Sequence, residues 1–279
     1  MYTRHNEKLL AAREKKAALV AAHRGAMGGS VIQNTTLAYK TALMGGADCI
    51  EMDVVESTDG VFFAVHNGEE KHLLHMDKDI RTCSSAEIET YHCYNSLQNR
   101  MVHQKLERVA DVLPRFRNTC FINIDRSWFY WPDAITLLSG FHMEDQIILK
   151  APPEDKYLDI LEQSGSDIMF MPIIRNVDEW EKTERRNINV VAAEFVFDDL
   201  SNPVVSPAFI DSLHAKHVLT WVNALTLWDD KSISGFLDDN LSISEGPDAG
   251  WGKLRAMGFD ILQTDWPGLL YAYLKTKKV

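Results

Sequence analysis

The chain has 279 residues and carries 40 acidic against 29 basic side chains, which gives a formal net charge of −11 at pH 7. This charge argues against binding to nucleic acid or to an anionic membrane surface, because both require a basic surface. The hydrophobic fraction of 46% is ordinary for a globular protein, and the length suits one large α/β barrel or two smaller domains.

The N-terminal region has no features of a targeting segment. Residues 1–16 are charged throughout, and the apolar run over 17–22 is too short to cross a bilayer. We therefore expect a cytoplasmic protein without an integral membrane segment.

The cysteines form no Cys-x-x-Cys pair and fit buried free thiols in a reducing compartment. They are Cys49, Cys83, Cys93 and Cys120.

The first third of the chain alternates between helical and strand-like patterns, and an insertion follows. Its polar, histidine-rich segment over 68–104 predicts an excursion over one barrel mouth, with surface histidines rather than metal ligands. The predicted elements are a helix over 6–16, a strand over 18–23, a helix from 34 or 35 to 43, a strand over 49–55, a returning run over 61–65 and a short helix over 84–91.

The remaining chain continues this alternation with no break in composition. Eight strands and about eight helices predict a single (β/α)₈ barrel domain over 1–279, with the insertion after the second strand. Neither a dinucleotide-binding nor a P-loop glycine motif is present. The later elements are helices over 106–115, 131–138, 152–163, 178–185, 207–214, 251–257 and 267–275, strands over 120–125, 146–150, 167–174, 189–197, 217–223 and 260–264, and an acidic loop over 224–250.

Glu51 and Asp53 are two residues apart in a strand-like run. This spacing places both carboxylates on one face, about 7 Å apart along the chain. Two carboxylates that share one space repel each other unless a cation or a proton lies between them. The two acids could instead be solvated on an exposed face, but their apolar neighbours Ile50, Met52 and Val54 favour a strand covered on both sides.

Polar residues recur at the C-terminal ends of the predicted strands, where barrel enzymes carry their chemistry. Three carboxylates suit Mg²⁺ or Ca²⁺, whereas zinc would require cysteine or more histidine ligands. Two histidines with basic neighbours suit a tetrahedral anion and proton transfer. The set predicts metal-assisted phosphoryl transfer and consists of His23-Arg24, Glu51, Asp53, His66, Asp125, Lys150, Trp221 with Asn223, and Thr264-Asp265.

Short motifs along nearly the whole chain resemble, in kind, order and spacing, those of the glycerophosphodiester phosphodiesterase family, which has a (β/α)₈ barrel fold. The resemblance implies a metal-dependent phosphodiesterase that releases glycerol 3-phosphate and an alcohol. The motifs are His23-Arg24-Gly25, Gln33-Asn34-Thr35, Gly46-Ala47-Asp48, Ile50-Glu51-Met52-Asp53-Val54, Thr58-Asp59-Gly60, Val65-His66-Asn67, Trp221-Val222-Asn223 and Thr264-Asp265-Trp266-Pro267.

The site residues are assigned on this basis, with a small phosphodiester as substrate and either water or a substrate hydroxyl as nucleophile. One divalent cation, Mg²⁺ or Ca²⁺, would be the cofactor. The assigned residues are Glu51, Asp53 and Asp125 for the metal, His23 and His66 for acid/base catalysis, and Arg24, Lys150 and Trp221 for the substrate.

Four positions depart from the family pattern. Gln33 stands where the family usually has Glu, Asn67 replaces an Asp, and Asp125 is shorter than the usual Glu. Ser127 replaces the family's Lys, and we expect Lys150 from the next strand to supply that cation. These departures leave two alternatives open, namely a sphingomyelinase D-like phospholipase with the aromatic residues of 128–131 near its substrate, and a barrel that binds phosphodiesters with weakened catalysis.

Overall fold

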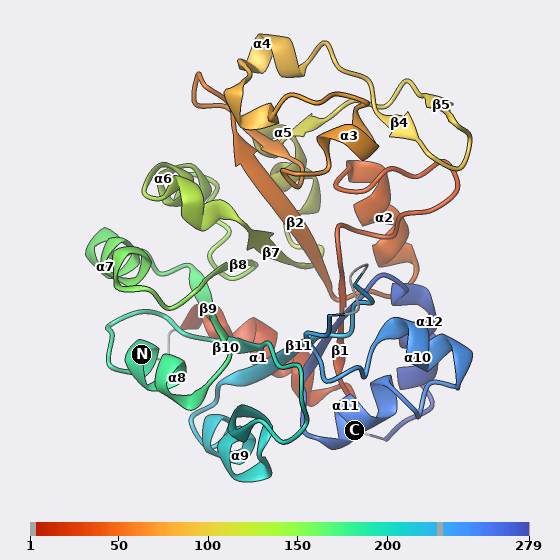
Figure 1. Ribbon diagram of the computed structural model, residues 1–279. Helices are drawn as coiled ribbons and strands as arrows, with labels where there is room; N and C mark the ends of the chain where they lie inside the picture. Colours follow the sequence, from red (N-terminus) through yellow and green to blue (C-terminus); the bar gives the residue numbers. More distant parts are fainter. Residues whose placement is uncertain (1–3, 228–230, 279) are drawn as a thin grey trace.

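The structure is a computed structural model that describes residues 4–227 and 231–278. Eight parallel strands close into a barrel, because β1 (Leu19–Ala22) pairs with β2 (Cys49–Glu56) on one side and with β12 (Ile261–Thr264) on the other. Helices surround this barrel in Figure 1. The predicted (β/α)₈ architecture is confirmed. The other barrel strands are β7 (Phe121–Asp125), β8 (Ile147–Ala151), β9 (Met169–Ile174), β10 (Ala192–Phe195) and β11 (Leu219–Asn223).

The helices begin and end at residues with a clear physical role. Thr35 caps α2, since its side chain accepts a hydrogen bond from the backbone of Ala38. After this helix, Gly46 has a φ of 95°, and a Cβ atom there would overlap the Tyr271 ring. The helices are α1 (Glu7–Glu14), α2 (Thr36–Met44), α5 (Val109–Val112), α6 (Asp133–Ser139), α7 (Asp155–Ser164), α8 (Val177–Glu184), α9 (Pro207–His214), α10 (Asp239–Ser244), α11 (Trp251–Ala256) and α12 (Pro267–Leu274).

Successive side chains along each strand point alternately into the barrel and outward beneath the helices. Along β2, Cys49 belongs to the interior cluster, whereas Ile50, Met52 and Val54 pack in the outer core. Glu51 and Asp53 have the same parity as Cys49, and thus point into the barrel. Along β7, β8, β10, β11 and β12, inward positions are likewise apolar at the start and polar at the C-terminal end. The polar inward residues are Asn123, Asp125, Lys150, Glu194, Asn223 and Gln263.

The insertion follows a hairpin that extends from the barrel. β2 pairs antiparallel with β3 (Phe62–Ala64), and β3 pairs with β6 (Glu107–Arg108). The inserted segment has its own apolar cluster, and Figure 1 shows it at the top of the view. Cys83 and Cys93 lie in this cluster, and all four cysteines are buried and free, as predicted. The inserted elements are α3 (Glu70–Leu73), α4 (Ser85–Ile88), β4 (Tyr94–Asn95) and β5 (Arg100–Met101).

Two local predictions are wrong. The helix predicted over 106–115 is reduced to α5, because Pro114 lacks a backbone donor and lies in the 3₁₀ helix that follows. The loop predicted over 224–250 contains α10, which Asp238 caps by accepting a hydrogen bond from Leu241 at 2.9 Å. Residues 228–230 of this loop lie outside the described residues. The 3₁₀ helices are η1 (Arg4–Asn6), η2 (Ile80–Thr82), η3 (Leu113–Phe116), η4 (Ser127–Tyr130) and η5 (Pro203–Val205).

Among the described residues, no helix combines the length and the apolar character that are needed to cross a bilayer.

Candidate active site

Three carboxylates converge at the C-terminal ends of β2 and β7. The register of these strands pairs Asp53 with Asp125, and Glu51 lies one inward position below. The three residues each offer an oxygen within 4.8 Å of the others, and this group is the one potential metal site of three or more ligands found over 4–227 and 231–278. Glu51 and Asp53 are buried and Asp125 is partly exposed. The structure thus brings together the three predicted metal ligands.

Glu51 has an electrostatic reason to bind a cation. One of its oxygens accepts a hydrogen bond from the backbone of Arg24 at 2.8 Å, but Oε1 is buried without a partner. Burial raises the pKa of Glu51 well above its usual value, and the charges of Asp53 and Asp125 raise it further. A divalent cation between the carboxylates would remove this penalty. The donor set consists of oxygens only and therefore fits Mg²⁺ or Ca²⁺.

Asp53 is held in its ionised form by basic and amide neighbours. Burial opposes its ionisation, but the charges of Arg24, His66 and His23 outweigh burial and keep the pKa of Asp53 below its usual value. The Nε of Arg24 lies 3.0 Å from Oδ2 of Asp53, and the Asn34 amide donates to the same oxygen at 3.0 Å. The predicted catalytic histidines therefore both act on the central carboxylate of the cluster.

The His-Arg-Gly sequence makes a tight turn after β1. Arg24 has a φ of 53°, and Gly25 has a φ of 82°. A Cβ atom at Gly25 would lie 2.6 Å from the backbone carbon of Ala38 in α2, so only glycine fits this close approach. The turn directs the Arg24 side chain toward Asp53, where its guanidinium also donates to Gln33 Oε1 at 2.7 Å.

His23 is oriented by Asp265, which the sequence places among the polar strand ends without indicating its role. Its Nδ1 lies 2.8 Å from Oδ1 of Asp265, which follows β12. This contact occupies Nδ1, so proton exchange with a substrate would use Nε2. The backbone N–H of Asp265 donates in turn to the buried carboxylate of Asp239 at 2.8 Å. Thr264-Asp265 was recognised as a polar strand end, whereas Asp239 lies in the segment predicted as a loop and gave no signal.

His66 follows β3 and borders the cluster from the side of the insertion. Its Nδ1 is buried without a hydrogen-bond partner. Burial lowers the pKa of His66, and although Asp53 opposes this shift, the charges of Arg24 and Arg126 add to it. The imidazole is therefore biased toward the neutral form, which can accept a proton.

Lys150 and Trp221 were predicted to contact the substrate, but both lie below the surface of the site. Lys150 is 3% exposed, and its Nζ lies 3.0 Å from Asp125 and 2.9 Å from Glu194. Trp221 is fully buried, with its indole N–H shared between Asn223 and Gln263. Both side chains point into the barrel interior, which explains this burial, and neither is exposed to a substrate at the carboxylate cluster. Glu194, the second partner of Lys150, was not predicted, although an acid inside an apolar strand is a usable signal.

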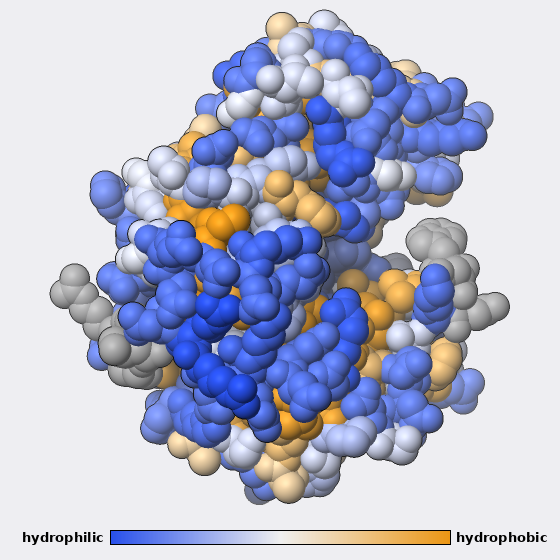
Figure 2. Space-filling view, turned by 60° about the vertical axis from the view of Figure 1, so that its left-hand side comes forward, coloured by the Kyte–Doolittle hydropathy of each residue, from blue (hydrophilic) through white to orange (hydrophobic). Residues whose placement is uncertain are grey.

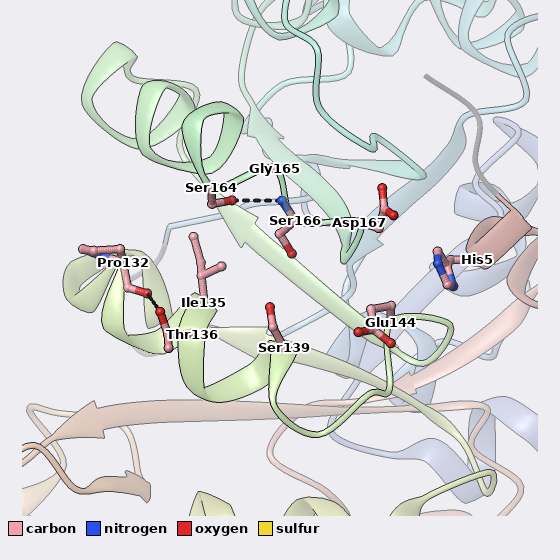
Figure 3. A pocket seen from close by; sticks show the side chains of 10 residues that line it. All are labelled: His5, Pro132, Ile135, Thr136, Ser139, Glu144, Ser164, Gly165, Ser166 and Asp167. Carbon is pink, nitrogen blue, oxygen red and sulfur yellow. Dashed lines mark hydrogen bonds between the residues drawn. The ribbon is translucent and has the colours of Figure 1, made fainter.

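A separate groove of about 740 Å³ lies on the outside of the barrel between α6 and α7. Figure 3 shows side chains from these helices together with His5, Glu144 and Asp167 around it. Glu144 precedes β8 and Asp167 precedes β9, which places this groove toward the N-terminal ends of the strands. None of the predicted site residues lines it, and it is therefore distinct from the carboxylate cluster.

Comparisons with solved structures agree on the fold. Residues 170–274 match a family described as a domain of unknown function, DUF4996, and no curated protein matches the chain. A glycerophosphoryl diester phosphodiesterase structure from Parabacteroides distasonis has a TM-score of 0.77 at 14% identity, covering 96% of this chain and 90% of that chain. A glycerophosphodiester phosphodiesterase structure from Agrobacterium tumefaciens has a TM-score of 0.65 at 18% identity, covering 91% and 99%.

A third solved structure carries a bound product. It is a phosphodiesterase from Oleispira antarctica in complex with sn-glycerol-3-phosphate, with a TM-score of 0.65 at 14% identity and coverage of 92% of this chain and 96% of that chain. The chain therefore shares the barrel fold of solved glycerophosphodiester phosphodiesterases, which confirms the fold that its sequence motifs imply.

Proposed function

We propose that this protein is a metal-dependent phosphodiesterase that hydrolyses glycerophosphodiesters to glycerol 3-phosphate and an alcohol. The observation that carries the proposal is the convergence of Glu51, Asp53 and Asp125 within 4.8 Å, with His23 and His66 both near enough to influence the pKa of Asp53. The fold of solved glycerophosphodiester phosphodiesterases and the product in one of them support the choice of substrate.

Each polar group of the site has a role in this reaction. Glu51, Asp53 and Asp125 would hold one Mg²⁺ or Ca²⁺ ion, which supplies polarisation of the phosphoryl group when bound. Arg24 neutralises the phosphodiester oxygens. His66, biased toward its neutral form, takes the proton of the nucleophile. If the nucleophile is water, glycerol 3-phosphate forms directly; if it is a neighbouring substrate hydroxyl, the first product is a cyclic phosphate, which a water molecule must open to give the monoester.

The second histidine completes the proton transfer. His23, oriented through Nδ1 by Asp265, donates a proton from Nε2 to the departing alkoxide. After the step His66 is protonated and His23 is neutral, and proton exchange with solvent restores the starting protonation state of each imidazole. Because the alcohol leaves as a neutral species, the proposal applies to poor leaving groups that require a general acid.

The proposal is tested by following release of glycerol 3-phosphate from glycerophosphocholine. The wild-type protein with Mg²⁺ or Ca²⁺ is expected to be active, and His23→Ala and His66→Ala are each expected to lose roughly 10²- to 10⁴-fold in kcat. His217→Ala, on the turn before β11, is the matched control. Wild-type rates in both site variants would remove the acid/base assignment.

A sphingomyelinase D-like activity is the second candidate. It is favoured by Phe129, which is 52% exposed in the turn after β7 and packs beside Trp128 with ring centroids 5.1 Å apart. Such an enzyme would need an apolar rim at its site. Figure 2 shows one side of the molecule, which is mostly hydrophilic with separate hydrophobic patches. Turnover of lysosphingomyelin in preference to glycerophosphocholine would favour this candidate over the first, and binding of both without turnover would indicate a barrel with weakened catalysis.

A further inference from the structure

Arg126 is a basic residue at the carboxylate cluster to which none of the motifs assigns a role. It follows Asp125 directly at the end of β7 and has a φ of 60°, a conformation that residues with side chains rarely adopt. The next residue, Ser127, is fully buried and accepts a hydrogen bond from the indole of Trp131 at 3.3 Å. The left-handed turn therefore exposes Arg126 at the site and buries the position that follows it.

The Arg126 guanidinium lies near one carboxylate oxygen of Asp53, and that of Arg24 lies near the other. Its Nε is 3.8 Å from Oδ1 of Asp53, whereas the Nε of Arg24 is 3.0 Å from Oδ2. The Nη1 of Arg126 donates to the side-chain oxygen of Asn67 at 3.1 Å, next to His66. Two guanidinium groups thus flank the same carboxylate, one from the turn after β1 and one from the turn after β7.

The basic residues of the site differ in how far acids compensate their charge. Lys150 is 3% exposed and contacts two carboxylates. The Arg24 side chain is 12% exposed, and its Nη1 lies 3.4 Å from Glu69 in addition to its contact with Asp53. The Arg126 side chain is 29% exposed, its Nε lies 3.8 Å from Asp53, and its Nη1 donates to the neutral amide of Asn67. Arg126 therefore retains the most accessible positive charge of these three.

The neutral partner is important for anion binding. The side-chain oxygen of Asn67 accepts a hydrogen bond from Arg126, which fixes the direction of the guanidinium without cancelling its charge. An aspartate at position 67 would instead form an ion pair with Arg126 and compete with an incoming phosphate. The planar guanidinium presents further N–H groups that suit two oxygens of one phosphate.

We propose that Arg126, oriented by Asn67, binds a non-bridging oxygen of the substrate phosphate and retains the phosphate monoester product. Arg126 would therefore supply the cation that was expected from Lys150. The nature of the substrate rests on the proposed function, but binding of a phosphate group at Arg126 is measured independently of turnover.

The test is calorimetric titration with glycerol 3-phosphate at saturating Mg²⁺. Arg126→Gln is expected to weaken binding by roughly tenfold or more, since a charge-assisted hydrogen bond is lost. Arg126→Lys, which keeps the charge without the planar fork, is expected to lose roughly threefold. The control is Arg115→Gln, because Arg115 is exposed and donates to the Asp111 carbonyl in the helix region after β6.

Asn67→Asp tests the neutral-partner argument and leaves Arg126 intact. We expect it to weaken glycerol 3-phosphate binding by roughly fivefold, because the new carboxylate pairs with the guanidinium. Asn176→Asp is the matched control, since Asn176 is an exposed cap of α8 where either residue serves. If Arg126→Gln does not fold, Arg126→Lys and Asn67→Asp decide the outcome. Wild-type affinity in these variants would overturn the proposal.

The binding titration, together with the turnover assay on glycerophosphocholine, separates failure of this inference from failure of the proposed function. If the wild type binds glycerol 3-phosphate through Arg126 but hydrolyses no glycerophosphodiester, the proposed function fails and the phosphate site stands. If the wild type hydrolyses glycerophosphocholine and Arg126→Gln leaves both KM and phosphate affinity unchanged, the role of Arg126 fails and the proposed function stands. Absence of phosphate binding by the wild type would reject the role of Arg126.

Discussion

The Nδ1 atom of His23 and the Oδ1 atom of Asp265 lie 2.8 Å apart, which links the turn after the first barrel strand to the turn after the last. Their strands are neighbours, since β1 pairs with β12 from Leu19–Ile261 to Ala22–Thr264. Closure of the barrel therefore creates this contact, and the acid/base function of His23 depends on it.

Asp265→Asn is expected to lower kcat for glycerophosphocholine by roughly 10²-fold, because it weakens the orientation of His23 and removes the charge that stabilises the imidazolium. KM should change little. Thermal unfolding is the discriminating measurement, since loss of the orienting contact should lower kcat without lowering stability, whereas a structural defect would lower both. Asp178→Asn, an exposed acid on α8, is the control.

Asp239→Asn is expected to destabilise the protein by about 1–3 kcal/mol, because one of the donors at this buried site is left facing an amide N–H. Asp239 accepts hydrogen bonds from the Trp251 indole at 2.8 Å, the Thr264 hydroxyl at 2.6 Å and the backbone of Asp265 at 2.8 Å. Urea denaturation measures the loss. Asp238→Asn is a matched control on the adjacent residue, where asparagine is an equally good helix cap.

The pH dependence of stability gives a separate prediction for Asp239. Burial raises its pKa to about 7, against 3.8 in the unfolded chain. Between about pH 4 and 7 the folded state therefore binds more protons at this carboxyl. Its contribution to the unfolding free energy must fall as the pH rises, by at most about 1.4 kcal/mol per pH unit.

The Asp239→Asn variant should lack this component of the slope. Urea denaturation of both proteins at pH 5, 6 and 7 measures the difference between them, which should shrink as the pH rises. A difference that grows with pH would show that the carboxyl is ionised across this range.

Glu51→Gln should separate metal binding from the integrity of the fold. The variant removes a buried charge, so the metal-free protein is expected to be at least as stable as the wild type. Mg²⁺ or Ca²⁺ should stabilise the wild type, by about 2.7 kcal/mol at a concentration of 100 Kd, but should not stabilise the variant. Thermal unfolding with and without chelator measures both effects. Glu181→Gln, at an exposed position on α8, is the control. Equal stabilisation of Glu51→Gln by the cations would contradict the ligand role of Glu51.

Lys150→Met should destabilise the protein by about 3–5 kcal/mol, because Asp125 and Glu194 would lose their common buried cation. Adding Glu194→Gln to this variant should recover part of the loss, since it removes one uncompensated charge. Guanidinium denaturation of the two variants measures the difference. Glu194→Gln alone is measured as well. If Glu194→Gln lowers the stability of Lys150→Met by as much as it lowers that of the wild type, the two side chains do not interact.

The sequence was most informative where a two-residue period and a strand end coincide. Glu51 and Asp53 share a face because of that period, and the apolar residues between them show that the strand is covered. The parallel pairing of β2 with β7 then brings Asp125 beside them from the next barrel strand. These features are local in the chain or follow from barrel topology, and they were predicted.

The remaining contacts depend on three-dimensional detail that no local pattern reports. Lys150 is polar and lies on a barrel strand, but its burial against Glu194 depends on a pairing across 44 positions of the chain. The approach of Asp239 to Asp265 depends on α10, which short apolar spacing and neighbouring acids made hard to recognise. The left-handed backbone at Arg126 accompanies the burial of Ser127, and neither feature is revealed by the amino acid type.

The most direct test of the account is a titration of the chelated protein with Mg²⁺ or Ca²⁺ while release of glycerol 3-phosphate from glycerophosphocholine is followed. The account predicts no turnover without cation, activity that saturates at one bound ion per chain, and loss of both the ion and the activity in Asp53→Asn. Full turnover by the metal-free protein, or wild-type ion binding by Asp53→Asn, would contradict a metal centre at Glu51, Asp53 and Asp125.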